Sequence, residues 1–361
     1  MPTVGTTSKP AYVYDAGTDT WIPVGVGAHT HDTSALVPYT NYFVAGKNKI
    51  VNGDFGINQR KFTTSTTSGA FTFDRFVHYT SDGTVTLSAQ AFSLGTAPVS
   101  GYEAKNFLQI ASTSQTATSA AAIIIHKLED VRTFAGQTTT FSFWAKASSG
   151  TPKVAIEISQ NFGNGGGSSV VNIYGGQVTL STSWARYSVT VNIPSISGKT
   201  IGTAADDNIQ VAIWTSAGSD FNSRTGSLGI QTTTIQTWGW QWEVGSAATP
   251  FSLATGSLAT ELAACQRYYQ RVGDSLYGII RGGTGDSADT DYSSYTNLTT
   301  MRTSPTATKV GTWATLNCAQ PAIIAADAKT FSLSAAIQTA VSVHYYFHSS
   351  ATNYIELSAE L

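Results

Sequence analysis

Two histidines near the start of the chain have the spacing of metal ligands. His29 and His31 are separated by one residue, so on an extended strand both imidazoles project to the same side. One chain offers two ligands, whereas three chains around a threefold axis would offer six, which suits an octahedral transition metal such as iron. Asp32 could orient one imidazole through a hydrogen bond. The alternative is a solvent-exposed turn in which neither histidine binds a metal.

Three tryptophans occupy alternating positions later in the chain. Because Trp238, Trp240 and Trp242 are two residues apart, a regular strand would place all three indoles on one side. Flat aromatic faces of this kind can form a glycan-binding platform, and they can equally fill the core of a β-sandwich. Both interpretations stay open at this point.

A glycine-rich polar segment concentrates three carboxylates. Asp286, Asp289 and Asp291 supply enough oxygens to attract calcium, although their spacing does not match an EF-hand loop. The simpler interpretation is a solvated loop. The alternative is a glycan-binding tip that contacts a receptor.

Other acidic residues are candidates for calcium binding or for catalysis. Asn52 and Asp54, together with Glu243, could supply a structural calcium site. An enzyme that cleaves glycosides would need two carboxylates roughly 5 to 10 Å apart, for which Glu157, Glu243 and Asp74 are the candidates. Each is more simply a turn or strand-edge residue, and the sequence contains no nucleophile elbow, Walker loop or zinc-protease motif. We therefore expect a protein that is not an enzyme.

Composition and charge restrict the partners. Of the 361 residues 12% are charged and 41% hydrophobic, and the remainder is rich in Thr, Ser and Gly, as is typical of β-proteins. Because 20 basic and 22 acidic residues give a net charge of −2, we expect no nucleic-acid partner. No apolar run approaches the roughly 20 residues that cross a bilayer, so we expect no membrane insertion. Cys265 and Cys318 do not indicate a disulfide framework.

The pattern of apolar residues divides the chain into three parts. Residues 1–46 have few strand-length apolar segments, although a small hairpin is predicted around residues 12–21. Residues 47–256 contain many short alternating strands separated by turn clusters, which predicts a β-sandwich. Residues 257–361 begin with a short helix and continue as a second, smaller β-sandwich.

The predicted helix has one apolar stripe and a capping residue before it. Ser257 or Thr260 can act as the N-cap. The stripe is predicted to consist of Leu258, Leu262, Cys265 and Tyr269.

Several phrases of the sequence resemble phrases that occur, in the same order, in the virion fibre and minor tail proteins of tailed bacteriophages. The resemblance covers roughly residues 47 to 361. The phrases are residues 49–60 (KIVNGDFGINQR), 73–76 (FDRF), 243–251 (EVGSAATPF), 265–271 (CQRYYQR), 301–306 (MRTSPT) and 358–361 (SAEL).

This resemblance implies an all-β fold with a jelly roll of the carbohydrate-binding-module kind. A smaller C-terminal β-sandwich would follow one short helix, and residues 1–46 would attach the chain to other virion proteins. The resemblance places the three tryptophans on a central strand, which favours core packing. His29 and His31 look similar to the His-x-His motifs that bind iron on the axis of some trimeric tail fibres.

The function that the resemblance implies is a homotrimeric tail fibre or receptor-binding protein that adheres to host-surface polysaccharide. It would be made in the host cytoplasm without a signal peptide and would reside on the virion, on the tail or the capsid exterior. One alternative is a capsid-decorating or head fibre, or a minor tail protein, without receptor binding. Another is a tailspike that depolymerises polysaccharide.

Overall fold

The computed structural model describes residues 11–15, 20–24, 46–339 and 343–361, which fall into two compact units, Met1–Tyr42 and Phe43–Leu361. In the first unit, strands β1 (Ala11–Asp15) and β2 (Thr20–Val24) pair antiparallel. This confirms the predicted hairpin. His29 and His31 lie outside the described residues.

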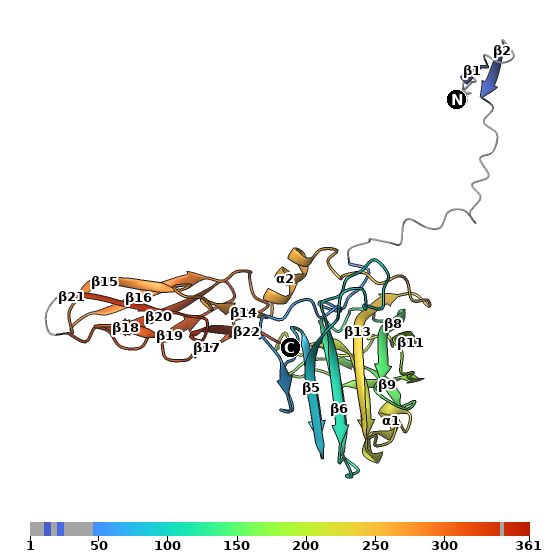
Figure 1. Ribbon diagram of the computed structural model, residues 1–361, viewed down its shortest axis with the longest axis horizontal. Coiled ribbons are helices and arrows are strands. Elements are labelled where there is room, and N and C mark those ends of the chain that lie inside the picture. Colours follow the sequence, from blue (N-terminus) through green and yellow to red (C-terminus); the bar gives the residue numbers. More distant parts are fainter. Residues whose placement is uncertain (1–10, 16–19, 25–45, 340–342) are drawn as a thin grey trace. The chain divides into compact units, whose positions relative to one another are not determined.

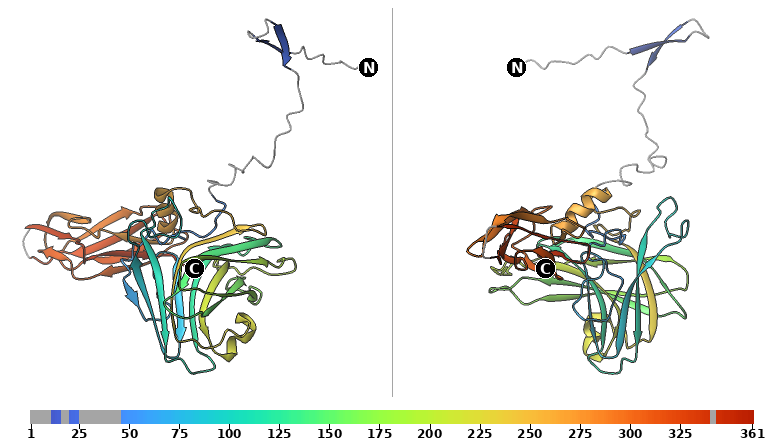
Figure 2. Two further views of the ribbon diagram at one scale, coloured as in Figure 1. Left: turned by 45° about the vertical axis from the view of Figure 1, so that its right-hand side comes forward. Right: turned by 60° about the vertical axis from the view of Figure 1, so that its left-hand side comes forward.

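The jelly roll consists of two antiparallel sheets packed face to face (Figures 1 and 2). One sheet has five strands in the order β10-β9-β12-β7-β4, and the other has six in the order β11-β8-β13-β6-β5-β3. The five strands are β4 (Phe76–Ser81), β7 (Ala121–Glu129), β9 (Lys153–Asn161), β10 (Val171–Thr179) and β12 (Asn208–Ala217). The six are β3 (Thr64–Ser65), β5 (Thr84–Ala91), β6 (Asn106–Thr113), β8 (Thr138–Ala147), β11 (Ala185–Asn192) and β13 (Thr233–Val244).

Alternation along the strands builds the core between these sheets. In β6, Leu108 and Ile110 are buried and Gln109 between them is half-buried, as expected for a strand with one face on the core.

The backbone approaches β13 closely at Gly53, whose carbonyl accepts a hydrogen bond from Trp240 N at 2.9 Å. A Cβ at Gly53 would lie 2.2 Å from the Trp240 carbonyl oxygen, so only glycine fits. The predicted all-β sandwich is confirmed.

The short 3-10 helix η2 (Ser219–Phe221) and helix α1 (Asn222–Thr225) connect β12 to β13. Helix α2 (Leu258–Gln266) begins where it was predicted, because Ser257 Oγ accepts a hydrogen bond from Thr260 N. None of the helices in the described residues is long and apolar enough to cross a membrane.

The buried face of α2 differs from the predicted apolar stripe. Leu258 is 60% exposed, and Tyr269 lies in the strand after the helix. The buried helix residues are Glu261 and Cys265. The Glu261 carboxylate accepts hydrogen bonds from the backbone of Asn52 and from Thr255, so a polar anchor replaces part of the predicted stripe.

The C-terminal module consists of three antiparallel sheets of three strands each, rather than two larger layers. Their orders are β14-β22-β17, β15-β21-β18 and β16-β20-β19, and they surround a core that includes Phe331, Phe347 and Trp313. The strands are β14 (Tyr269–Val272), β15 (Ile280–Gly285), β16 (Thr290–Thr296), β17 (Thr306–Val310), β18 (Ala314–Leu316), β19 (Ala322–Ala326), β20 (Thr330–Ala336), β21 (Val343–His348) and β22 (Tyr354–Ser358).

A buried charge network joins the jelly roll to the C-terminal module. Arg60 pairs with Asp74 at 2.9 Å and with Glu360 at 3.0 Å, and Arg75 also pairs with Glu360. The Arg75 guanidinium lies 3.3 Å from the centroid of the Tyr268 ring. Burial raises the pKa of Asp74, although the Arg60 charge opposes this shift. The two β-modules are therefore fixed to each other by paired charges.

Five of the six phrases that resemble phage proteins meet at this junction. Arg60, Arg75, Tyr268 and Glu360 come from four different phrases. Arg302, from a fifth, donates hydrogen bonds to the backbone carbonyls of residues 359 and 360. The phrases thus specify how two modules are joined.

Candidate functional site

A polar row crosses the outer face of the six-stranded sheet. Ser88 in β5 is paired with Gln109 in β6, Gln109 with Gln236 in β13, and Gln236 with Lys146 in β8. Residues directly opposite each other in a sheet share a face, so the four side chains form one line across four strands. Gln236 Nε2 donates a hydrogen bond to Gln109 Oε1 at 2.8 Å. All four side chains are half-buried.

Three half-buried aromatic rings border this row. The ring centroids of Phe92 and Phe107 are 4.8 Å apart, and Trp184 lies 5.5 and 5.4 Å from them. Lys146 Nζ lies 5.4 Å from the centroid of the Trp184 ring. Phe107 shares a face with Gln109, two residues further along β6. Together, Ser88, Gln90, Gln109, Lys146, Gln236, Phe92, Phe107 and Trp184 are called the amide–aromatic face.

The amide–aromatic face is equipped to bind a ligand that carries many hydroxyl groups. Each glutamine amide offers both hydrogen-bond donors and an acceptor. The Gln236 amide donates to Gln109, and its buried Oε1 has no hydrogen-bond partner in the described structure. The ring of Trp184 supplies a flat apolar surface. The face contains one positive charge, Lys146, and none of its eight residues is an acid. Its amides and rings are the groups that recognise a polyhydroxylated ligand.

The three alternating tryptophans belong to the core. Trp238, Trp240 and Trp242 are each 0% exposed, so no ring offers a face to a sugar. The interpretation as core residues holds, and the glycan-binding interpretation is corrected. Their indole Nε1 atoms donate to Asp54 O at 3.0 Å, Thr237 Oγ1 at 2.8 Å and Thr139 Oγ1 at 3.0 Å, respectively.

The tryptophans also do not share one side of their strand. The register of β13 against β8 shifts between Trp238 and Gln241, which marks a β-bulge with one extra residue. Trp238 is therefore paired with Trp144 on the outer side of the sheet. Trp240 lies 5.2 Å from Phe141 on the inner side. The bulge reverses the alternation that the sequence predicts.

The three aspartates near residue 290 do not converge on one point. Asp291 lies in β16, is buried, and pairs with Arg281 at 3.0 Å. Asp289 accepts a hydrogen bond from the backbone of Asp286, and Asp286 accepts one from Ala288 N. The prediction of one polar loop is therefore wrong for Asp291, because an ion pair holds it in a strand.

Asn52 and Asp54, which were predicted as calcium ligands, already form hydrogen bonds within the protein. Asn52 donates to two backbone carbonyls and accepts from Ile57 N. Asp54 accepts from Gly56 N and from the Tyr102 hydroxyl at 2.7 Å. Within the described ranges, no group of three or more His, Cys, Asp or Glu side chains is arranged to hold a metal.

The three candidate catalytic carboxylates each pair with a different cation. Glu157 binds Arg224 at 2.6 Å and also accepts from the Trp214 indole. Glu243 lies 3.4 Å from Lys47 and accepts from Thr249, while Asp74 pairs with Arg60. These carboxylates act as anchors for neighbouring segments.

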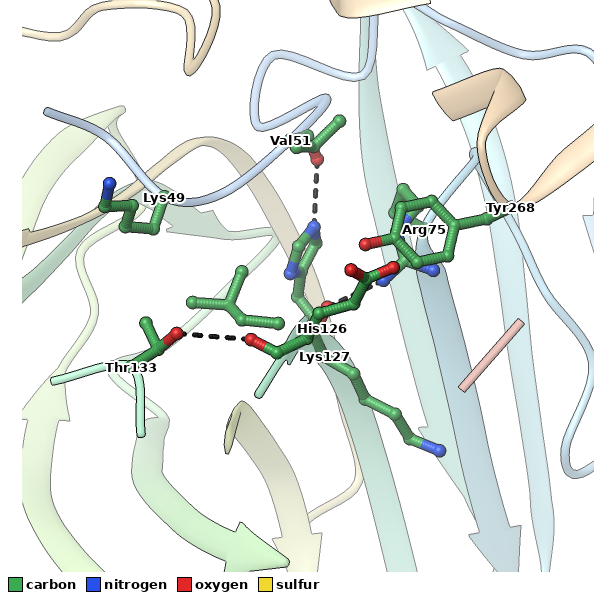
Figure 3. Close-up of a pocket in the computed structure, with 9 residues that line it drawn as sticks. Lys49, Val51, Arg75, His126, Lys127, Thr133 and Tyr268 are labelled. Atoms are coloured by element: carbon green, nitrogen blue, oxygen red, sulfur yellow. Dashed lines mark hydrogen bonds between the residues drawn. The ribbon is translucent and has the colours of Figure 1, made fainter. Parts of the chain in front are cut away.

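A small hollow of about 190 Å³ lies near the junction (Figure 3). His126 is 0% exposed, and its Nε2 donates to the Val51 carbonyl at 3.0 Å. Burial is the main cause that lowers the pKa of His126 far below its ordinary value, so the ring is neutral. The hollow is lined by Lys49, Val51, Arg75, His126, Lys127, Leu128, Glu129, Thr133 and Tyr268.

Sequence reasoning missed the amide–aromatic face, although part of its signal was present. In β8, the outward positions of Ser142, Trp144 and Lys146 alternate with apolar ones, and β6 carries Phe107 and Gln109 in the same way. Strand order and register, which the sequence does not reveal, were needed to align these residues.

A carbohydrate binding domain family model matches residues 47–207 of this chain. This part of the chain therefore carries a jelly roll of the carbohydrate-binding-module kind. The matched range includes every residue of the amide–aromatic face except Gln236. No curated protein matches the sequence.

Solved structures with a similar fold are distant. Tailspike protein 4 of bacteriophage CBA120, in its enzymatically active domain, is 13% identical with a TM-score of 0.33, and the match covers 55% of this chain and 22% of that one. This chain thus spans about a fifth of the tailspike. The CBM22-2 xylan-binding domain of Paenibacillus barcinonensis Xyn10C is 13% identical with a TM-score of 0.31, covering 50% and 98%. A structure described as "CBM4 structure and function" is 20% identical with a TM-score of 0.31, covering 54% and 99%.

Proposed function

We propose that this chain binds carbohydrate through the amide–aromatic face of its jelly roll. The observation that carries the proposal is the match of residues 47–207 to a carbohydrate binding domain. Hydroxyl groups of a sugar would exchange hydrogen bonds with Gln90, Gln109 and Gln236, while an apolar sugar face would lie on Trp184. Lys146 would favour an acidic polysaccharide.

We further propose that the chain is a structural protein of a tailed-phage virion, most simply a homotrimeric tail fibre or receptor-binding protein. The six phrases that resemble such proteins support this assignment. Residues 1–46 would attach the chain to other virion proteins, and the jelly roll would adhere to host-surface polysaccharide. Three copies would compensate for weak single-site binding by raising the effective concentration of the sugar.

The metal and enzyme parts of this proposal have direct tests. An axial iron on His29 and His31 predicts about one metal per three chains by elemental analysis, and a His29→Ala, His31→Ala variant should lose it. A calcium site would appear in the same measurement. A pure adhesin should release no reducing sugar from a polysaccharide that it binds. Release would instead support the depolymerase.

The central experiment measures binding of the full chain to an array of bacterial surface polysaccharides, followed by calorimetry with the strongest. A Trp184→Ala variant should bind roughly tenfold more weakly, because an aromatic anchor at an interface contributes more than about 1 kcal/mol. The matched control is Tyr79→Ala in the five-stranded sheet, where Tyr79 is 40% exposed. Equal binding by the Trp184 variant and the unchanged chain would overturn the proposed site.

Proteomic analysis of purified particles tests the virion assignment separately. The chain should be present in intact phage particles at a fixed ratio to the other structural proteins. Its absence from particles of a phage that encodes it would overturn the virion assignment without affecting carbohydrate binding.

A further inference from the structure

The C-terminal module has two outward sheet faces of opposite character. On the sheet β16-β20-β19, the outward residues are mainly hydroxyl-bearing. Ser294 and Ser332 are hydrogen-bonded through their side chains at 2.8 Å, and Tyr292 is paired with Ser334. The residues between them along β20, such as Leu333, are buried in the core. This face, called the hydroxyl face, suits contact with water.

The sheet β15-β21-β18 presents an apolar face instead. Ile280 and His348 are neighbours across two strands, as are Leu316 and Tyr346. Ile280 is 56%, Leu316 42% and Tyr346 40% exposed, whereas Phe347, between the outward residues of β21, is 0% exposed. The apolar face comprises Tyr277, Ile280, Gly282, Ala314, Leu316, Tyr346 and His348, and it ends at the exposed polar pair Thr284 and His344.

Aromatic rings and a glycine line this face. The rings of Tyr277 and His348 are 4.4 Å apart, and His348 is stacked with Tyr346 at 6.0 Å. Gly282 lies opposite Tyr346, and a Cβ there would approach the Tyr345 carbonyl oxygen to 2.7 Å. Bare backbone therefore borders the Tyr346 ring, so another surface can approach closely.

Exposed apolar side chains are concentrated in this module. Of the fifteen large hydrophobic side chains that are exposed among the described residues, eight lie between positions 276 and 346. Apolar side chains that gather on one face of a soluble protein mark a surface that a partner covers. Four of the eight, Tyr277, Ile280, Leu316 and Tyr346, lie on the apolar face, whereas Tyr292 and Ile324 belong to the sheet of the hydroxyl face.

We propose that the apolar face is an interface between copies of this chain. None of the residues on this face is Asp, Glu, Lys or Arg, so copies of it can meet around a symmetry axis without like-charge repulsion. It lacks the amide side chains that line the amide–aromatic face, which makes a hydroxyl-rich ligand a poor occupant. In addition, β15 is an edge strand that pairs only with β21 in the described sheet, and an open edge favours contact with another chain. The inference deepens the homotrimer part of the proposed function and is independent of carbohydrate binding.

The test compares two lysine substitutions in the full-length chain by size exclusion with light scattering. We expect the unchanged chain to have the mass of a multimer at micromolar concentration. Leu316→Lys should shift it to the mass of one chain, because a buried unpaired charge at an interface is costly. Tyr292→Lys, at a position 66% exposed on the hydroxyl face, is the matched control and should leave the multimer intact.

Two further measurements keep the outcome interpretable. Tyr346→Lys provides a second disruption of the same face, and the thermal unfolding of each variant shows that it is folded. A single-chain mass for the unchanged protein, or a multimer that survives both substitutions in folded variants, would overturn the proposal. Loss of calorimetric affinity for a short oligosaccharide that fills a single site, in a folded Leu316→Lys variant, would also overturn it, because the face would then bind sugar. Failure of the unchanged chain to bind any polysaccharide would contradict the proposed function alone.

Discussion

The amide–aromatic face of the jelly roll and the apolar face of the C-terminal module both combine aromatic rings with accessible sheet surface, but they differ in polar groups. On the first, Gln109 and Gln236 form a hydrogen-bonded pair beside Lys146 and the ring of Trp184. On the second, Tyr346 has Leu316 and Gly282 as its cross-strand neighbours. Aromatic exposure alone therefore does not identify a ligand.

The neighbours of each ring decide which partner fits. A sugar is bound through many hydroxyl groups, so its site needs donors and acceptors next to a ring. The buried centre of a protein–protein interface instead favours uncharged apolar side chains. Under the two proposals, adhesion would fall to the jelly roll and assembly to the C-terminal module. The charge network around Glu360 joins these modules.

The largest expected effect comes from a ring that belongs to neither face. Trp240→Ala should lower the free energy of unfolding by about 3–5 kcal/mol, because it empties a fully buried site between the sheets. Denaturant unfolding measures this loss. Trp184→Ala, on the amide–aromatic face, is the matched variant and should cost far less stability. Equal losses of stability for the two variants would contradict the assignment of Trp240 to the core and of Trp184 to the surface.

The buried histidine His78 of the jelly roll should make stability depend on acid. Burial lowers the pKa of His78 to about 4. As pH falls below about 6.5, the unfolded chain takes up a proton that folded His78 does not accept until about pH 4. Stability is therefore lost across this window, by roughly 2 kcal/mol after allowance for solvent screening.

Unfolding measured at several pH values between 7 and 4 tests this expectation. His78→Gln should make the loss on acidification less steep. An identical slope for this variant and the unchanged chain would show that His78 does not control acid stability.

Much of the fold could be predicted because it depends on local patterns. The alternation of apolar and polar residues predicted the sandwich, and Ser257 correctly predicted the start of α2. The side of a strand on which a residue lies could not be predicted where a bulge intervenes. The extra residue between Trp238 and Gln241 separates tryptophans that perfect alternation places together.

The candidate site was less predictable because it depends on contacts between distant segments. Gln109 and Gln236 are 127 positions apart and meet only through strand pairing. Five of the six recognisable phrases instead contribute to the junction, where Arg60 reaches Glu360 across 300 positions. Recognition by phrases therefore located the connection between modules and missed the proposed binding surface.

Replacing one amide should convert part of the amide–aromatic face to the character of the apolar face. Gln236→Leu keeps the approximate size of the side chain but removes its hydrogen-bonding groups, including the bond to Gln109. We expect polysaccharide affinity to fall by up to about tenfold, since a hydrogen bond contributes roughly 0.5–1.5 kcal/mol. Calorimetry measures the change. A tighter complex would mean that apolar contact dominates on this face, as it does on the other.

The smallest expected effect tests whether the two faces act independently through the helix between their modules. Ser257→Ala removes the N-cap hydrogen bond to Thr260 N and should lower the free energy of unfolding by about 1 kcal/mol. Polysaccharide affinity and the mass of the multimer should both stay unchanged, because Ser257 is exposed and belongs to neither face. Ser257→Asp, which restores a capping oxygen, should recover the stability. The contrary outcome is a change in polysaccharide affinity or multimer mass in the alanine variant that recovers with aspartate. That outcome would show that α2 couples the two faces, and it would contradict their independence.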